Sequence, residues 1–321
     1  EVTVVGIGDM SGDVFGNGML LSKTIKLIAA FDHRHIFLDP DPNAAVSFAE
    51  RKRLFGLTRS SWADYDASCL SEGGGVYTRE AKYVHISAQA AKALQIKQTK
   101  ITPNNLIQAI LSAPVDLLWN GGIGTYVRSS TQSNRDCSDP SNDGCRISAL
   151  DLRATVVGEG GNLGFTQEAR IEYLLNNGLM NTDFIDNAGG VMCSDNEVNI
   201  KILLQSLVQN KTINFKERNA LLNKLVPDVI NLVLRNIYLQ NLALSIAEIG
   251  GLTKMEIYLR YIEALAKSKQ VDTQVDKLPD REVVAQRLAV DQQPMTRAEL
   301  AILLSRSKSL LVQSLKNGSF I

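Results

Sequence analysis

The first part of the chain alternates short apolar runs with stretches of helical periodicity. Runs rich in β-branched and aromatic residues predict strands at Val2–Val5, Ile25–Phe31, Tyr83–Ile86, Val115–Trp119 and Thr155–Val157. Apolar residues at helical spacing predict helices between them, for example at Asn43–Phe55 and Pro103–Leu111. Strands that alternate with helices favour a parallel sheet with helices on both faces. Residues 1–200 are therefore expected to form a doubly wound α/β domain of the Rossmann type.

Beyond about residue 200 only the helical period remains. Apolar residues recur at i, i+3, i+4 and i+7 over Asn219–Glu248, and the pattern returns over Met255–Lys267 and Arg297–Leu315. Thr296, three residues before Glu299, is typical of a helix N-cap. Residues 201–321 are therefore expected to form an all-α helical domain. Its apolar stripes exceed what one bundle of this size buries, so we expect it to dock on the α/β domain.

Composition and charge exclude several classes of protein. The chain has 321 residues, enough for two domains, and its 34 Lys and Arg residues balance its 34 Asp and Glu residues. No net charge therefore indicates nucleic acid or an anionic membrane as a partner. The most apolar segment, Leu225–Leu252, is interrupted by Pro227 and by charged residues, which favours a pair of core helices over a membrane span. No signal peptide is recognisable, so we expect a cytoplasmic protein.

Two local features of the composition concern order and redox state. Cys69, Cys137, Cys145 and Cys193 show neither CxxC spacing nor histidine companions, which predicts free thiols and no metal site. A disulfide between Cys137 and Cys145 is the alternative. Residues Arg128–Arg146 are rich in Ser, Asn, Asp and Gly and offer too little apolar surface for a fixed shape, so a flexible surface loop is expected there. The chain begins directly on a core strand, which indicates a piece of a longer polypeptide.

A glycine-rich turn follows the first strand, with glycines at Gly6, Gly8 and Gly12. In a Rossmann domain the first glycine allows a sharp turn and the second lets the backbone approach a dinucleotide pyrophosphate. The next helix presents its N-terminal amides to the phosphates. Asp32 ends the next strand about 20 residues after Gly12, where this fold places the carboxylate that binds a ribose hydroxyl. Ser11 stands where a third glycine is usual, so the turn has an extra residue or the helix begins differently. An ordinary tight turn is the alternative to a dinucleotide site.

Three further turns rich in glycine and asparagine follow apolar segments, at Asn120–Gly124, Gly158–Gly164 and Asn187–Gly190. In an open parallel sheet such turns gather at the carboxyl edge, where ligands bind beside the reversal of strand order. Asparagine offers both a donor and an acceptor, which suits a carboxamide or a ribose hydroxyl. The four turns together predict a nucleotide-binding edge.

The residues of these turns carry a resemblance to a known family. Gly158–Asn162, followed by Asn187–Val191 and a serine, resembles the amino-acid dehydrogenases and glutamate dehydrogenase above all. Longer segments are similar in sequence to the corresponding segments of the very large bacterial NAD-specific glutamate dehydrogenases. They are Gly6–Ser22, Phe31–Pro40, Leu118–Tyr126, Val156–Thr166 and, in the helical tail, Thr296–Leu300. The resemblance covers essentially the whole chain.

This resemblance implies a role for individual residues. The residues that match the pyrophosphate loop of the family are Gly6, Gly8, Asp9, Met10, Ser11 and Gly12. Asp32 matches the acid that holds the adenosine ribose, and Asn120 and Gly121 match the turn beside the nicotinamide. Asn162 matches the residue at the nicotinamide ribose and Asn187 the residue near the carboxamide. Ser194 matches the serine that binds the side-chain carboxylate of glutamate.

The resemblance also implies an activity and its partners. The expected reaction is the oxidative deamination of L-glutamate to 2-oxoglutarate and ammonia with NAD, by a full-length protein that is a homo-oligomer. The family's catalytic lysine and aspartate patterns do not occur in this chain, and Lys82, Lys97 and Lys100 lack that setting. We therefore expect these groups in the remainder of the polypeptide, and this chain alone to be inactive. Asp32 favours NAD over NADP, although Arg34 could pair with a 2′-phosphate.

A nucleotide-sensing or interaction module with a non-catalytic Rossmann fold is the alternative function. A sensor needs groups for the adenosine half of the dinucleotide only. A hydride-transfer site also needs groups around the nicotinamide and the substrate. The set of Asn120, Asn162, Asn187 and Ser194 therefore favours the enzyme.

Overall fold

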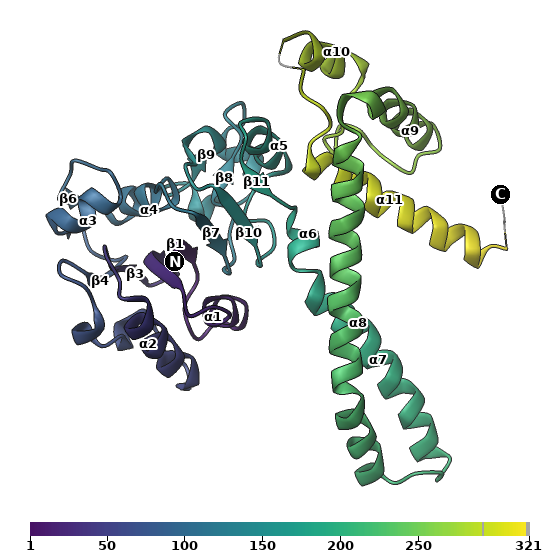
Figure 1. Cartoon of the computed structure of the whole chain (residues 1–321), viewed down its shortest axis with the longest axis horizontal. Helices are drawn as coiled ribbons and strands as arrows, with labels where there is room; N and C mark the ends of the chain where they lie inside the picture. Colours follow the sequence, from purple (N-terminus) through teal and green to yellow (C-terminus); the bar gives the residue numbers. More distant parts are fainter. Residues whose placement is uncertain (291, 319–321) are drawn as a thin grey trace.

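The computed structural model describes residues 1–290 and 292–318, and it divides into an α/β part and a helical part (Figure 1). A seven-stranded sheet with the strand order β11-β10-β7-β1-β2-β3-β4 forms the centre of the α/β part. Its strands are β1 (Val2–Ile7), β2 (Ile25–Phe31), β3 (His35–Leu38), β4 (Gly75–Thr78), β7 (Leu117–Asn120), β10 (Val156–Glu159) and β11 (Leu179–Met180).

The sheet is mixed, whereas the sequence predicted that its strands are parallel throughout. The strands from β11 to β2 pair in parallel, whereas β3 and β4 are antiparallel to their neighbours. The reason is the short connection between β2 and β3, because a parallel pair needs a crossover of a dozen or more residues. Three residues allow only a hairpin here, and the carboxylate of Asp32 holds it by accepting the amide N–H of Arg34 and His35.

Most predicted strands exist, with shifted ends. Ile25–Phe31 has the predicted bounds, and the strands predicted at Val2–Val5, Val115–Trp119 and Thr155–Val157 each end one or two residues later. The run Tyr83–Ile86 does not join the main sheet. Its strand β5 (Val84–His85) pairs with β6 (Lys100–Ile101) in a separate two-stranded sheet. Strands β8 (Val127–Arg128) and β9 (Ile147–Ser148) form a second two-stranded sheet.

Helices cover both faces of the sheet, and alternate residues of β1 enter two cores. Val4 packs with Phe15 and Met19 of α1 and Leu54 of α2. Val5 and Ile7 enter the other core with the apolar faces of α3, α4 and α5. These helices are α1 (Asp13–Leu20), α2 (Ala44–Gly56), α3 (Ala88–Ala93), α4 (Pro103–Leu111) and α5 (Gln167–Leu175). The predicted helix Pro103–Leu111 has its predicted bounds, because Thr102 caps it and Pro103 occupies its first turn.

The helical part begins before residue 200. Its helices are α6 (Asp183–Asp186), α7 (Ala188–Gln209), α8 (Phe215–Ile249), α9 (Met255–Lys267), α10 (Arg281–Val290) and α11 (Arg297–Lys316). Helix α7 therefore runs through the boundary expected at residue 200. In Figure 1, α7 and α8 form a long hairpin that extends away from the sheet.

Helix α8 is one continuous helix of 35 residues, so the predicted pair of core helices is wrong. Pro227 lacks the N–H of one intrahelical hydrogen bond, but the flanking turns continue the helix on both sides. Much of its apolar surface is exposed, as at Leu234 and Tyr238. By length and composition alone, α8 is the one helix of the described residues that could cross a membrane, and 11% of its apolar window is buried.

The helical part contacts the α/β part mainly through α11, which packs on α5 as well as on α8. The side-chain amide of Gln167 donates to the carbonyl of Ala298 at 3.3 Å, and that of Gln293 donates to the carbonyl of Leu175 at 3.0 Å. Lys277 forms an ion pair with Glu168 at 2.8 Å. The expected docking therefore exists at this end, whereas the α7–α8 hairpin keeps much of its apolar surface exposed.

The segment Arg128–Arg146 contains two 3-10 helices, at Asn134–Cys137 and Pro140–Asn142, and is not the shapeless loop that its composition predicts. Its anchor is the buried guanidinium of Arg146. This group donates to the carbonyls of Thr125 and Asp139 at 2.8 and 2.6 Å and pairs with Asp143 at 2.5 Å. Polar contacts thus replace the apolar core that the segment lacks. The four cysteines are free thiols, and no disulfide joins Cys137 to Cys145.

Replacing Arg146 with Gln should loosen this segment. The variant leaves the carbonyls of Thr125 and Asp139 without their donor, and each buried acceptor that loses its partner costs about 1–3 kcal/mol. We expect limited proteolysis to cut within residues 128–146 faster in Arg146→Gln than in the wild type. Arg135→Gln changes an exposed arginine of the same segment and is the matched control. Equal cleavage rates in the two variants would contradict the anchoring role of Arg146.

Candidate functional site

The carboxyl ends of the central strands meet at one edge of the sheet. The chain passes from β1 through α1 to β2 on one side, whereas β7 lies on the other side of β1. The strand order therefore reverses between β1 and β7, which is where open α/β sheets bind ligands. Gly8, Asp32, Asn120 and Glu159 end or follow β1, β2, β7 and β10 at this edge. The structure thus brings three of the four predicted turns together.

The first turn depends on close packing of α1. Gly6 lies inside β1 and not in the turn itself, so its predicted role in a sharp turn is wrong. A Cβ on Gly6 would lie 2.4 Å from the ring of Phe15, and one on Gly8 would lie 2.8 Å from it. Gly8 makes the turn with a φ of +137°, a conformation that only glycine adopts easily. The carbonyl of Gly8 accepts a hydrogen bond from the indole of Trp62 at 2.9 Å.

The residues from Asp9 to Gly12 form a small turn that leads into α1. The carboxylate of Asp9 accepts from the hydroxyl of Ser11 at 2.7 Å and from the amide of Gly12 at 2.9 Å. Helix α1 begins at Asp13, so the extra residue lies in the turn. The side chain of Met10 is buried in the core, which leaves only its backbone for a ligand. The first amide that donates a hydrogen bond within α1 is that of Gly16, which donates to the carbonyl of Gly12. The amides of residues 13–15 therefore have no acceptor within the helix.

Asp32 presents one buried oxygen that has no donor. Its side chain is 7% exposed, and Oδ1 accepts the amides of Arg34 and His35 at 2.7 and 2.6 Å. Arg79 donates to the backbone carbonyl of Asp32 at 2.8 Å. Oδ2 is buried without a hydrogen-bond partner in the described part of the chain. A buried carboxylate oxygen without a donor suits a hydroxyl group of a ligand.

Asn120 presents the complementary group, a buried donor. It is fully buried, and its Oδ1 accepts the amide of Gly122 at 3.3 Å. Its Nδ2 has no acceptor among residues 1–290 and 292–318. A Cβ on Gly164 would lie 1.7 Å from this nitrogen, so Gly164 makes the room for it. A Cβ on Gly121 would meet the backbone of Phe15 at 2.8 Å, which assigns Gly121 to the packing of α1.

The structure also brings Asn162 and Asn187 together, from the turn after β10 and from the residue before α7. The amide nitrogen of Asn187 donates to the side-chain oxygen of Asn162. Ser194 lies on α7 beyond them and is exposed. The two asparagines are therefore joined by a hydrogen bond, whereas Ser194 lies on the exposed surface of α7 apart from them.

A buried ion cluster behind these turns could not be recognised from the sequence. The carboxylate of Glu159 is fully buried and accepts from Nε and Nη2 of Arg170 at 2.7 and 3.0 Å. Arg170 also pairs with Asp183 at 3.3 Å, and Asp183 accepts the amide of Leu163 at 2.8 Å. Burial raises the pKa of Glu159 to about 7, although Arg170 opposes the rise. The cluster fixes the turn that carries Asn162.

Comparison with known proteins identifies the family. The model of the family described as bacterial NAD-glutamate dehydrogenase, catalytic domain, matches residues 1–247. The chain belongs to this family. It is 52% identical over 315 residues to an NAD-specific glutamate dehydrogenase of Pseudomonas aeruginosa, and 50% identical to proteins of the same name from Halomonas elongata and Mycobacterium tuberculosis.

These relatives are much longer than the chain. The alignments cover 96–98% of the chain but 19% of each relative, so the chain spans about a fifth of their length. Solved glutamate dehydrogenases show a weaker likeness. A Plasmodium falciparum glutamate dehydrogenase has a TM-score of 0.43 at 16% identity, over 97% of this chain and 46% of that one. A hetero-hexameric glutamate dehydrogenase of Thermus thermophilus has a TM-score of 0.30 at 13% identity, over 73% of this chain and 41% of that one.

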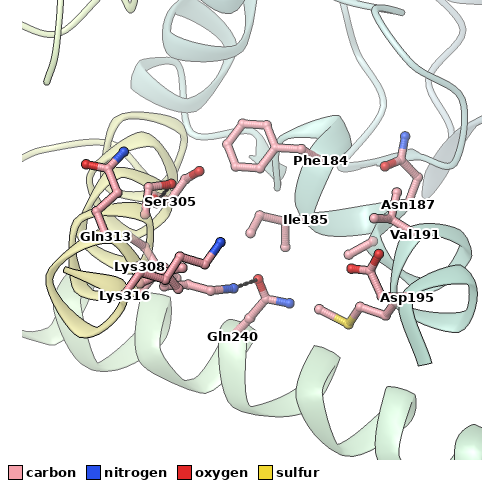
Figure 2. A pocket seen from close by; sticks show the side chains of 15 residues that line it. Phe184, Ile185, Asn187, Val191, Asp195, Gln240, Ser305, Lys308, Gln313 and Lys316 are labelled. Atoms are coloured by element: carbon pink, nitrogen blue, oxygen red, sulfur yellow. Dashed lines mark hydrogen bonds between the residues drawn. The ribbon is translucent and has the colours of Figure 1, made fainter. Parts of the chain in front are cut away.

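In this member of the glutamate dehydrogenase family a cavity of about 700 Å³ lies next to Asn187 (Figure 2). Helix α6, the first turns of α7, Gln240 of α8 and residues 304–316 of α11 line it. Lys308 donates to the side-chain oxygen of Gln240 at 3.0 Å across it. Val191 and Asp195 line the cavity from α7, whereas Ser194 on the same helix does not. The cavity thus borders Asn187 and does not include Ser194, the residue predicted to bind the substrate.

The raised pKa of Glu159 makes stability depend on pH. Between about pH 4.5 and 7 the native state keeps a proton that the unfolded state has lost. The wild type should therefore lose free energy of unfolding as the pH rises through this window. Glu159→Gln lacks this titrating group. The difference in free energy of unfolding between Glu159→Gln and the wild type should therefore shift in favour of the variant by up to about 3 kcal/mol as the pH rises from about 4.5 to 8.

Urea denaturation at pH 4.5 and pH 8 measures this difference. Glu80→Gln, which changes an exposed carboxylate, is the control and should differ from the wild type by the same amount at both values. A difference between Glu159→Gln and the wild type that does not change with pH would contradict the prediction.

Proposed function

We propose that this chain is the NAD-binding part of a glutamate dehydrogenase. The observation that supports it best is that two of the buried polar atoms without partners lie at this edge, the acceptor Oδ2 of Asp32 and the donor Nδ2 of Asn120. They end the strands on the two sides of β1 and its Gly8 turn. Each such atom costs about 1–3 kcal/mol unless a ligand supplies its partner. A dinucleotide placed across the turn offers a ribose hydroxyl to the first and an acceptor to the second.

The other residues have roles that follow the course of the dinucleotide. The backbone from Gly8 to Gly12 and the first amides of α1 hold the pyrophosphate, because these amides carry the positive end of the helix dipole. Asp32 holds the adenosine ribose, Asn162 the nicotinamide ribose and Asn187 the carboxamide. Asn187 donates to Asn162, so each asparagine fixes the orientation of the other. Ser194, exposed on α7, contributes to the site of the substrate side-chain carboxylate.

The whole protein would convert L-glutamate to 2-oxoglutarate and ammonia. When bound, NAD accepts the hydride from the substrate, and the residues of this chain bind and orient it. We propose that the lysine and aspartate for proton transfer come from another part of the polypeptide. Lys100 supports this, because it lies on β6 with its Nζ 4.7 Å from the ring centre of Tyr83, and not at the carboxyl edge. The full-length protein is proposed to be a cytoplasmic homo-oligomer without nucleic-acid or membrane partners.

A non-catalytic nucleotide sensor remains the second candidate. Such a module would use the Asp32 side of the edge and would gain nothing from the nicotinamide. It should therefore bind ADP-ribose as tightly as NAD. The buried donor of Asn120 and the Asn162–Asn187 pair favour the enzyme, since they lie on the opposite side of β1 from Asp32.

The proposed site should prefer NAD to NADP. A 2′-phosphate would place up to two negative charges against the buried carboxylate of Asp32. We expect calorimetric titration to give tighter binding of NAD, and Asp32→Ala to weaken NAD by about 1–3 kcal/mol. Asp41→Asn is the control, because Asp41 is exposed and pairs with Lys26 near the start of β2, at the opposite edge. Tighter binding of NADP by the wild type would overturn the assignment of Asp32.

The chain alone should bind NAD and oxidise no glutamate. Each missing group for acid–base catalysis lowers the rate about 10²- to 10⁴-fold, and a missing wall of the site removes the positioning of substrate against cofactor. We expect no steady-state NADH production from glutamate above that of a heat-inactivated sample. Turnover by the purified chain would show that its own residues, for example Lys82 or Lys97, supply the proton-transfer chemistry.

A further inference from the structure

Arg297, the first residue of α11, connects the helical part to the proposed cofactor edge. Its guanidinium donates five hydrogen bonds and uses both sides of its fork. Nε donates to the side-chain oxygen of Asn181 at 2.5 Å. Nη1 donates to Ser245 at 3.2 Å and pairs with Glu248, while Nη2 donates to the carbonyl and side-chain oxygens of Asn241 at 3.3 and 3.1 Å. One side chain thus binds α8 and the connection between β11 and α6.

From Asn181 the contacts continue into the cofactor edge. The amide nitrogen of Asn181 donates to Oδ1 of Asp186 at 2.7 Å, and Oδ2 of Asp186 accepts the backbone amide of Glu159 at 2.9 Å. Asp186 directly precedes Asn187, which donates to Asn162. The backbone of Glu159 carries the turn that contains Asn162. Three hydrogen bonds therefore lead from the helical tail to both asparagines of the proposed nicotinamide side.

We propose that Arg297 is a positioning residue that sets the Asn162–Asn187 pair for the nicotinamide half of the dinucleotide. The inference rests on the function proposed above and adds to it a residue on the helical part. It gives the tail a role in cofactor binding: α11 must be docked for the nicotinamide side to have its binding geometry. The adenosine side, at Asp32 and Gly8, is not part of this chain of contacts.

The chemistry of the contacts explains why an arginine stands here. Its planar guanidinium reaches partners on two elements at once, whereas a lysine presents a single point of charge. Burial raises the pKa of Asp186, while hydrogen bonds from Glu159 and Asn181 and the charge of Arg297 oppose the rise. Loss of Arg297 would therefore favour the protonated form of Asp186 and weaken its acceptance of both hydrogen bonds.

The surroundings of Arg297 tolerate a shorter side chain. A cavity of about 500 Å³ lies beside Arg297, Asn181 and Asp186. A lysine or glutamine at position 297 meets no steric obstacle on this side, and water can enter in place of the guanidinium. The variants are therefore expected to fold, which circular dichroism and thermal melting can verify.

The test compares NAD with ADP-ribose, which lacks the nicotinamide. Calorimetric titration of the chain should show that Arg297→Gln and Arg297→Lys weaken NAD roughly 2- to 30-fold, the range for residues that act through a chain of contacts. Binding of ADP-ribose should change by less than about twofold. The control is Arg281→Gln, because Arg281 bridges Glu256 and Glu263 within the tail, away from the cofactor edge. It should leave both ligands unchanged.

Asn181→Ser tests the same chain of contacts at its middle. It breaks the link to Asp186 and leaves the bonds of Arg297 to Ser245, Glu248 and Asn241 in place. It should weaken NAD selectively, and the effect of the double variant Asn181→Ser with Arg297→Gln should be smaller than the sum of the two, because both act through one path.

Three results would overturn the inference. Equal weakening of NAD and ADP-ribose would mean that Arg297 only supports the fold. Unchanged affinities for both ligands, in the Arg297 variants and in Asn181→Ser, would mean that these contacts do not affect the binding site. A wild-type chain that binds neither ligand would instead remove the proposed cofactor function, on which the inference rests.

Discussion

The close approach of α1 to the sheet is the constraint on which the carboxyl edge of the sheet depends. Phe15 lies so near to Gly6, Gly8 and Gly121 that a Cβ at any of these positions would come within 3 Å of it. The same aromatic side chain meets Trp62 edge to face, and Trp62 holds the carbonyl of Gly8. The amides that would meet a pyrophosphate are therefore oriented by apolar packing beneath them. Glycine is required at these three positions for the packing of α1 on the sheet.

Local signals predicted much of the fold, and their failures have physical reasons. The helical spacing predicted the bounds of α4, which Thr102 caps, and the run Ile25–Phe31, apolar except for Lys26, predicted the bounds of β2. The strand β3 was missed because a three-residue hairpin replaced the expected crossover. In the segment Arg128–Arg146, composition showed little apolar surface, but no sequence pattern reveals that Arg146 is buried among carbonyl groups. Contacts between distant residues decide such cases.

The candidate site was predicted as a set of turns and not as a set of atoms. The sequence predicted that Asp32, Asn120, Asn162 and Asn187 share one edge. The first three follow or end strands of the sheet there, and Asn187 joins them through its hydrogen bond to Asn162. The unpartnered oxygen of Asp32 and nitrogen of Asn120 depend on which neighbours face them, which no spacing specifies. Glu159 and Arg170 are 11 positions apart and belong to a strand and a helix, so their ion pair followed no helical or strand repeat.

The buried ion cluster behind the turn after β10 lowers the stability of the fold. Glu159, Asp183 and Asp186 lie around Arg170, so the acids outnumber the nearest cation and burial raises the pKa of two of them. Apolar residues of the same volume often stabilise a fold more than a buried ion pair does. Arg297 adds a second cation from α11. Its charge favours the ionised form of Asp186, and Asn181 accepts a hydrogen bond from Arg297 and donates one to Asp186. Since apolar packing could not hold the amides of Glu159 and Leu163 in place, the cluster serves the geometry of the turn more than the stability of the fold.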